Sequence, residues 1–185
     1  MGRGNIIGAA SGVFQMVDHI AAESKILVAK QGGIAQIRAT GRASFKLCPD
    51  LREFCSRAMR QGVTRFIFDL SECTAMDSTF MGTLAGLGIE GRGKCEVVLV
   101  NITDTNRHLL DGLGITRLFQ FRSTPKSEID WNTLCSAVDG ESAQDMMKAA
   151  PTVLAAHQTL MQADAGNIPK FKSVVEMLAA EMNGK

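Results

Sequence analysis

The sequence predicts an α/β protein: a mixed, mostly parallel β-sheet flanked by helices, with an all-helical C-terminal extension. Between residues 26 and 121, short β-rich runs alternate with segments of helical periodicity, a pattern typical of parallel strands joined by helices. The first two runs are separated only by a glycine turn, which predicts one antiparallel hairpin. Beyond residue 122 the apolar residues recur only at helical spacing, which predicts the extension.

The expected order of elements is β-β-α-β-α-β-α-β. Residues 26–29 and 34–39 are the hairpin strands, joined by a turn at residues 31–33. A first helix follows, because apolar residues recur at offsets of 3, 4, 7 and 8 from Leu51 until Gly62 stops the pattern. The remaining strands are RFIFDL (65–70), EVVLVNI (96–102) and LFQF (118–121).

Two more helices connect these strands. One begins after Asp77 and ends at Gly91. The other is capped by Thr103 or Asp104 and ends at Gly114. Because strand–helix–strand crossovers are right-handed, the strands that these helices join are expected to run parallel, with helices covering the sheet.

The chain divides into three parts. Residues 1–24 are an N-terminal segment, helical or poorly ordered; residues 25–122 form the sheet domain; and residues 123–185 form the helical extension, in which Pro151 suits a helix first turn. The two extension helices can close on each other or dock on the sheet domain. They could join two copies of the chain, mimic a partner or stabilise the sheet domain as a cap, and the sequence does not choose among these roles. Their apolar stripes are Val153, Leu154, His157, Leu160 and Met161, and Phe171, Val174, Val175, Leu178 and Met182.

Composition argues against several classes of function. The 185 residues include 20 basic and 19 acidic side chains, so bulk charge gives no support for direct nucleic-acid binding. No stretch reaches the roughly 18 apolar residues of a membrane span. The five cysteines are never spaced C-x-x-C, and the three histidines lie far apart. We therefore expect no metal site and no disulfides, as in a cytoplasmic protein with reduced thiols.

No pattern of catalytic residues points to an enzyme or to a cofactor. The P-loop pattern G-x-x-x-x-G-K-[ST] is absent. The glycine-rich piece GLGIEGRG (86–93) lies within and after a helix, whereas a dinucleotide site needs the turn from a strand into a helix. Ser78 lacks the G-x-S-x-G elbow of a hydrolase, and His108 has only single-residue support as a base. We predict no catalytic residues.

The segment MDSTF (76–80) carries the most informative polar residues. Asp77 is a good helix N-cap and Ser78 falls at the first helical position, where capping alone contributes on the order of 1 kcal/mol. The same position, between a strand end and a helix start, also presents a hydroxyl that a kinase could reach. A phosphate there would be stabilised by the helix dipole, but it would add about −1.5 to −2 charges beside Asp77. The sequence is compatible with both interpretations of this segment, a structural helix cap and a regulatory hydroxyl.

The motifs taken together resemble a STAS domain of the bacterial anti-sigma factor antagonist family. The resemblance rests on the order of elements, on the strand RFIFDLS with the following MDST, on Gly82, and on VNITDTNRHLLDGLGITRLF (100–119). It covers about residues 25–122. In that family an apolar strand ends near Asp, and Asp-Ser-[Ser/Thr] opens the second helix. The ordered set is more specific than any one motif.

The resemblance implies partner switching rather than catalysis. In the family, the unphosphorylated domain binds an anti-sigma factor that is also a serine kinase; phosphorylation of the motif serine breaks the complex, and a phosphatase restores it. Carried over, Ser78 would be the phosphate acceptor and Thr79 a less favoured one. The docking surface would combine the start of the second helix with loops at 41–44 and 71–76. Its predicted residues are Gly41, Arg42, Ser44, Thr74, Met76, Asp77, Ser78, Thr79, Phe80 and Met81.

Two departures from the family pattern affect this expectation. The family's Ser-x-Gly-Leu-Gly is changed here, because Phe80 and Met81 intervene before Gly82. We expect Phe80 to pack in the core, with an exposed interface position as the alternative. Arg42 follows the loop glycine where many members carry an acid, so recognition by the kinase would differ.

Two alternative functions remain. One is a STAS adaptor subunit that binds a non-sigma partner, for example a lipid-transporter ATPase, without phosphorylation. The other is a small enzyme or nucleotide-binding protein that uses the C-terminal edge of the sheet. Phosphate on Ser78 would distinguish the phosphorylation-controlled module from the adaptor. A deep polar pocket at the C-terminal edge of the sheet would favour the enzyme or nucleotide-binding protein.

Overall fold

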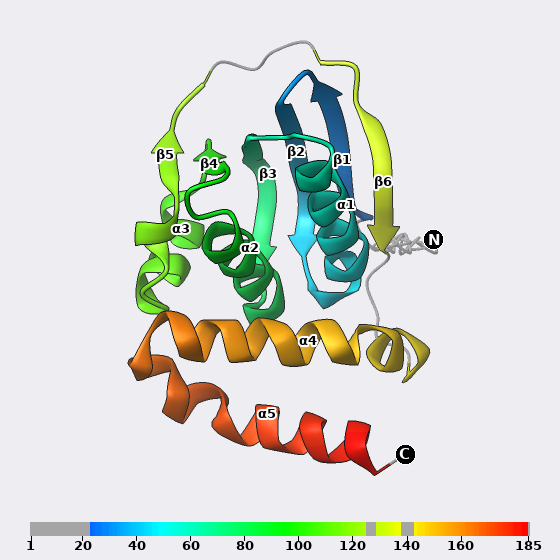
Figure 1. Cartoon of the computed structure of the whole chain (residues 1–185), viewed down its shortest axis with the longest axis vertical. Coiled ribbons are helices and arrows are strands. Elements are labelled where there is room, and N and C mark those ends of the chain that lie inside the picture. The colour runs from blue at the N-terminus through cyan, green and yellow to red at the C-terminus, as the bar shows by residue number, and fades with distance from the viewer. Residues whose placement is uncertain (1–22, 125–128, 138–142, 185) are drawn as a thin grey trace, which may run out of the picture.

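The computed structural model of the chain describes residues 23–124, 129–137 and 143–184, and its centre is a six-stranded sheet. The strands are β1 (Ser24–Gln31), β2 (Ile34–Ala43), β3 (Arg65–Met76), β4 (Glu96–Val100), β5 (Gln120–Arg122) and β6 (Asn132–Ala137). Their order is β5-β4-β3-β2-β1-β6 (Figure 1). Strands β2 to β5 pair in parallel, whereas β1 pairs antiparallel with both β2 and β6. The prediction for the N-terminal segment falls almost entirely on residues 1–22, outside the described residues.

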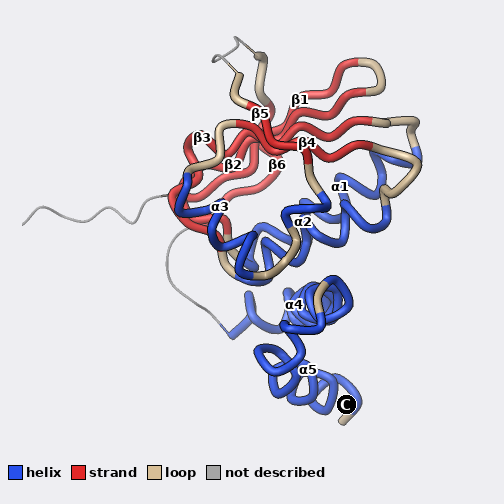
Figure 2. The backbone as a smooth tube through the Cα atoms, turned by 90° about the vertical axis from the view of Figure 1, so that its left-hand side faces the viewer, coloured by secondary structure: helices blue, strands red, loops and turns tan. Residues whose placement is uncertain are grey.

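The helices lie on one side of the sheet. They are α1 (Cys48–Arg60), α2 (Ser78–Glu90), α3 (Asp104–Gly112), α4 (Ala143–Ala163) and α5 (Ile168–Asn183). Figure 2 shows α1 and α2 below the sheet, α4 beneath them, and α5 outermost. The mixed, mostly parallel sheet with a C-terminal helical extension confirms the predicted fold class.

Helix α2 is buried around most of its circumference. Its residues Thr79–Ala85 and Leu87 are all buried, because the sheet covers one side of the helix and α4 the other. A helix that is apolar all round is expected where two layers enclose it. The largest fully buried side chains of the core are Phe66, Phe68, Phe80, Ile26, Ile37, Leu47, Leu51, Leu70, Leu84, Leu99, Leu110 and Ile115.

Three features differ from the sequence-based expectation. The extension is not all-helical, since β6 pairs with β1 at the edge of the sheet and so forms a strand despite a weak apolar pattern. The segments 41–43 and 71–76, expected as loops, pair with each other and prolong β2 and β3. Pro151 lies inside α4 rather than in its first turn, with its ring exposed, so the missing N–H faces no buried partner.

The C-terminal hairpin, which we define as α4 and α5, both closes on itself and docks on the sheet domain. The 3-10 helix Ala165–Asn167 joins its two helices, and α4 packs across α2 (Figure 1). The side chains of Ala156 and Leu160 on α4 are almost completely buried by this docking. The extension is thus part of the folded unit rather than a separate appendage.

Candidate functional site at the start of helix α2

Asp77 closes the corner between the sheet and α2. One carboxylate oxygen, Oδ1, accepts a hydrogen bond of 2.8 Å from the amide of Phe80, as an N-cap should. The other, Oδ2, accepts one of 2.7 Å from the amide of Phe45 in the chain that follows β2. The predicted cap is therefore confirmed, and the same side chain also ties the end of β2 to the start of α2. Burial raises the pKa of Asp77, although these two hydrogen bonds and the nearby Arg42 oppose the shift.

Ser78 occupies the first position of α2, as predicted, and its hydroxyl contacts the C-terminal hairpin. The Ser78 Oγ lies 2.9 Å from Nε2 of His157 on α4. The other ring nitrogen of His157, Nδ1, lies 2.9 Å from the carbonyl oxygen of Val153, one helical turn earlier. A carbonyl can only accept, so Nδ1 carries a proton, and in the neutral ring Nε2 accepts the hydrogen bond that Ser78 donates.

His157 is held in this position by burial and by α5. Its side chain is 5% exposed, and its ring centre lies 4.9 Å from that of Phe171 on α5. Burial lowers the pKa of His157, while the Val153 carbonyl and the charge of Asp77 oppose that shift. The neutral ring is therefore the form that the docked hairpin favours. The sequence placed His157 in an apolar stripe, but no local pattern linked it to a serine 79 residues away.

Part of the predicted docking surface lies at the molecular surface. Arg42 and Thr74 are exposed, and Gly41, Ser44, Asp77 and Ser78 are half-buried. These residues lie together because β2 and β3 run side by side and both end next to the start of α2. Gly41 has a φ of +65°, and a Cβ there would come within 2.9 Å of the Ser24 hydroxyl, so this position requires glycine.

The other predicted docking residues are buried, which corrects the docking surface expected from the sequence. Phe80 is completely buried, in agreement with the expectation that it packs in the core. Thr79, Met81 and Met76 are 4%, 6% and 7% exposed. Thr79, Phe80 and Met81 are buried because α2 is enclosed between the sheet and α4, and Met76 is buried at the end of β3. In this conformation they are not available to a partner, and the Thr79 hydroxyl is not available to a kinase.

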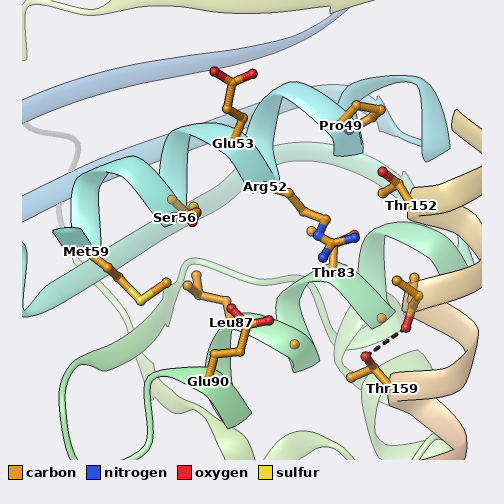
Figure 3. A pocket seen from close by; sticks show the side chains of 15 residues that line it. Pro49, Arg52, Glu53, Ser56, Met59, Thr83, Leu87, Glu90, Thr152 and Thr159 are labelled. Atoms are coloured by element: carbon orange, nitrogen blue, oxygen red, sulfur yellow. Dashed lines mark hydrogen bonds between the residues drawn. The ribbon is translucent and has the colours of Figure 1, made fainter. Parts of the chain in front are cut away.

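An open groove of about 390 Å³ lies between α1, α2 and α4 (Figure 3). All the residues that line it belong to helices, so it is not at the C-terminal edge of the sheet, where the enzyme alternative would place a pocket. Its polar groups are mainly threonines and glutamates, and the hydroxyls of Thr83 and Thr159 donate to carbonyl oxygens of their own helices. Neither Ser78 nor His157 lines it.

The described residues contain neither a metal-binding cluster nor a membrane span. Within residues 23–124, 129–137 and 143–184, no three His, Cys, Asp or Glu side chains come together in a way that could hold a metal ion. No helix in the same ranges is long and apolar enough to cross a membrane. The five cysteines are free thiols, and burial raises the pKa of Cys135 to about 11.

Comparison with known proteins identifies the family. Among solved structures, the anti-sigma factor antagonist SpoIIAA in its unphosphorylated form is 20% identical, with a TM-score of 0.46 over 55% of this chain and 89% of the other. The phosphorylated form of SpoIIAA from Bacillus is 21% identical, with a TM-score of 0.47 over 55% of this chain and 92% of the other. Protein TM1081 of Thermotoga maritima is 12% identical, with a TM-score of 0.49 over 67% of this chain and 91% of the other. No curated protein matches the sequence. The family model described as the STAS domain matches residues 25–128, more than half of the chain, and the chain therefore belongs to the STAS domain family.

Proposed function

We propose that this STAS domain is a regulatory binding module that docks a partner protein around the start of α2 and is switched by phosphorylation of Ser78. The proposed partner is an anti-sigma factor that is also a serine kinase, with a phosphatase that resets the switch. These proteins act in the cytoplasm, where ATP is available. The proposal assigns no catalytic residue, cofactor or metal to this chain, and oligomerisation through the extension stays a prediction.

The observation that carries the proposal is the contrast between the two adjacent hydroxyls. Ser78 is half-buried next to the exposed Arg42 and Thr74, whereas the Thr79 side chain is 4% exposed and packed in the core. The Asp77 cap holds the start of α2 independently of the Ser78 hydroxyl. The hydroxyl can therefore be modified without loss of the cap, which a switch requires.

Phosphorylation of Ser78 would act by charge. In the transfer, Ser78 Oγ bonds to the γ-phosphorus of ATP, the bond from that phosphorus to the bridging oxygen breaks to release ADP, and the hydroxyl proton passes to a base of the kinase. The product carries about −1.5 to −2 charges beside Asp77. A partner surface that fits the neutral hydroxyl is then repelled, while the fold of the domain is preserved.

The test compares Ser78→Ala with Ser78→Asp, each used to capture partners in the native cell. We expect Ser78→Ala to stay folded and to retain a protein with serine kinase activity about tenfold better than Ser78→Asp, a difference that corresponds to about 1.4 kcal/mol. Ser136→Asp, the same charge change at an exposed position of β6, is the control and should bind like the unchanged chain.

Equal capture by Ser78→Ala and Ser78→Asp would contradict the switch. It would favour the adaptor alternative, in which the same surface binds a non-sigma partner without phosphorylation. Loss of folding in Ser78→Ala would instead return Ser78 to a structural role.

A further inference from the structure

Helix α4 lies over the hydroxyl that the proposed switch uses. His157 accepts the hydrogen bond from Ser78, and one turn further along α2, Gly82 meets the backbone of α4 at Ala156. We call these four residues, Ser78, Gly82, Ala156 and His157, the crossing contact. They belong to two segments that the family match separates, because the STAS match ends at residue 128 and α4 begins after it.

The approach of the two helices depends on the absence of a side chain at residue 82. A Cβ added to Gly82 would lie 2.5 Å from the carbonyl oxygen of Ala156 and 2.8 Å from the Ala156 Cβ, both too close for any real contact. At Gly86, one turn further along the same helix, an added Cβ would lie 3.9 Å from Thr159, an ordinary contact distance. Gly82 is thus the residue that lets α4 come down onto α2.

The crossing contact consists of Gly82 against Ala156 and of the hydrogen bond between Ser78 and His157. Beside it, an open groove of about 390 Å³ lies between α1, α2 and α4 (Figure 3). Threonines 83, 152 and 159 line this groove together with Gly86 and the exposed Glu53 and Glu90. Since stabilisation grows with the apolar area removed from water, a helix crossing next to an open groove is less strongly held than one that is packed along its whole length.

We propose that α4 is a built-in lid over the start of α2, so that a protein kinase or partner reaches Ser78 only when α4 lifts from Gly82. The inference rests on the proposed function, since it names what regulates access to the same hydroxyl. With the lid closed, the Ser78 proton is donated to His157 and the oxygen is in contact with the ring. A kinase must align that oxygen with the γ-phosphorus of ATP, which the closed arrangement prevents.

Phosphate on Ser78 and the closed lid also exclude each other. A separation of 2.9 Å between Ser78 Oγ and His157 Nε2 is a hydrogen-bond contact, with no space for a phosphorus and its oxygens between them. Phosphorylation of the open form therefore keeps the lid open. The unphosphorylated chain exchanges between a closed form, in which the Ser78 hydroxyl is covered by α4, and an open form that binds.

The test measures access to residue 78 directly and needs no kinase. Ser78→Cys in the full chain is labelled with a maleimide that carries a polyethylene glycol chain. The labelling rate of the introduced thiol is read by mass spectrometry of its peptide, apart from the five native thiols. Gly82→Ala is then added to force α4 away, and Gly86→Ala is the matched control. We expect Gly82→Ala to raise the labelling rate about tenfold and Gly86→Ala to leave it unchanged.

A second pair of variants acts from the lid itself. Ala156 is 3% exposed and faces Gly82, so Ala156→Glu places an unpaired charge in the contact, whereas Gln158→Glu on the same helix is exposed and serves as its control. These changes leave the sheet domain untouched, so α4 can lift while the domain stays folded, which circular dichroism verifies. Ala156→Glu should open residue 78 to the same extent as Gly82→Ala.

The lid is contradicted if both Gly82→Ala and Ala156→Glu fold and label no faster than their controls. It is equally contradicted if Ser78→Cys alone labels as fast as Thr74→Cys, which places a thiol at an exposed site of the same surface. A failure of the proposed function looks different: residue 78 would open as expected, yet Ser78 would carry no phosphate in the cell.

Discussion

Two of the contacts between the C-terminal hairpin and the STAS domain differ in kind. At the crossing contact, small residues and one serine–histidine hydrogen bond hold α4 to α2 beside an open groove. At the other place, which we call the tip contact, the Asn167 side chain donates hydrogen bonds of 2.9 Å to the carbonyl oxygens of Leu113 and Leu160, and both Asn167 and Leu160 are at most 1% exposed. Lys170 adds a bond of 2.8 Å from its ammonium to the Gly112 carbonyl.

This contrast indicates which end of the hairpin stays attached. A buried carbonyl that loses its donor is costly, so the tip contact resists separation, whereas the crossing contact lies beside an open groove and has one side-chain hydrogen bond. The hairpin is therefore expected to pivot about its tip and to lift from Ser78. Substitutions at the two contacts separate their contributions.

Replacing Asn167 by Ala should cause the greatest loss of stability. The substitution removes the side-chain donor of the buried Leu113 carbonyl and one of the two donors of the Leu160 carbonyl, which should lower the free energy of unfolding by about 2 kcal/mol. Urea titration measures the change. Asn183→Ala, at an exposed position near the end of α5, is the matched control and should stay within about 0.5 kcal/mol of the parent chain. A loss for Asn167→Ala no larger than that of the control would show that the tip is not an anchor.

A smaller effect is expected from pH at the crossing contact. Because burial lowers the pKa of His157 below its usual 6.5, a released or unfolded chain binds a proton there more readily than the docked chain does. The contribution of His157 to docking is thus complete above pH 6.5 and is lost as the pH falls below it. Labelling of Ser78→Cys, compared between pH 5.5 and pH 7.5 after correction for thiol ionisation, should report this opening.

The control for the pH effect is His157→Gln, which keeps an acceptor for residue 78 and does not titrate. Asp77 is the charged group at the start of α2 that faces His157, and α5 contributes the uncharged ring of Phe171. Asp77 has a raised pKa, so its window extends upward from its usual value of 3.8; protonation there favours the folded form and opposes any opening as the pH falls. If His157→Gln shows the same opening between pH 7.5 and pH 5.5, the histidine is not its cause.

Most of the sheet domain could be predicted from sequence because its signals are local. The alternation of β-rich runs and helical stripes indicated the strand and helix order up to β5, and Asp77 three residues before an amide that needs a partner predicted the cap that the structure shows. Strand β6 was missed because its six residues carry almost no apolar alternation and gain their hydrogen bonds from β1, a distant segment.

The candidate site was predictable only in part, for the same reason. Ser78 was found from its place at a helix start, but burial of Thr79, Phe80 and Met81 depends on how α2 packs between the sheet and α4, and α4 lies more than 60 residues away in the chain. The contact of Ser78 with His157 has no local signature, since a histidine in an apolar stripe is equally compatible with simple core packing. Gly82 was noted only as part of the family resemblance, and only the structure shows α4 against it.

Phosphosite mapping by mass spectrometry, with intact-mass stoichiometry, tests the switch and its lid together on protein isolated from its native cell. The chain is compared with its Gly82→Ala and Gly86→Ala variants across growth phases and stress. We predict phosphate on Ser78 and none on Thr79, with a larger phosphorylated fraction in Gly82→Ala than in the other two. Equal fractions in all three would contradict the lid, and the absence of phosphate from Ser78 in every sample would contradict the switch itself.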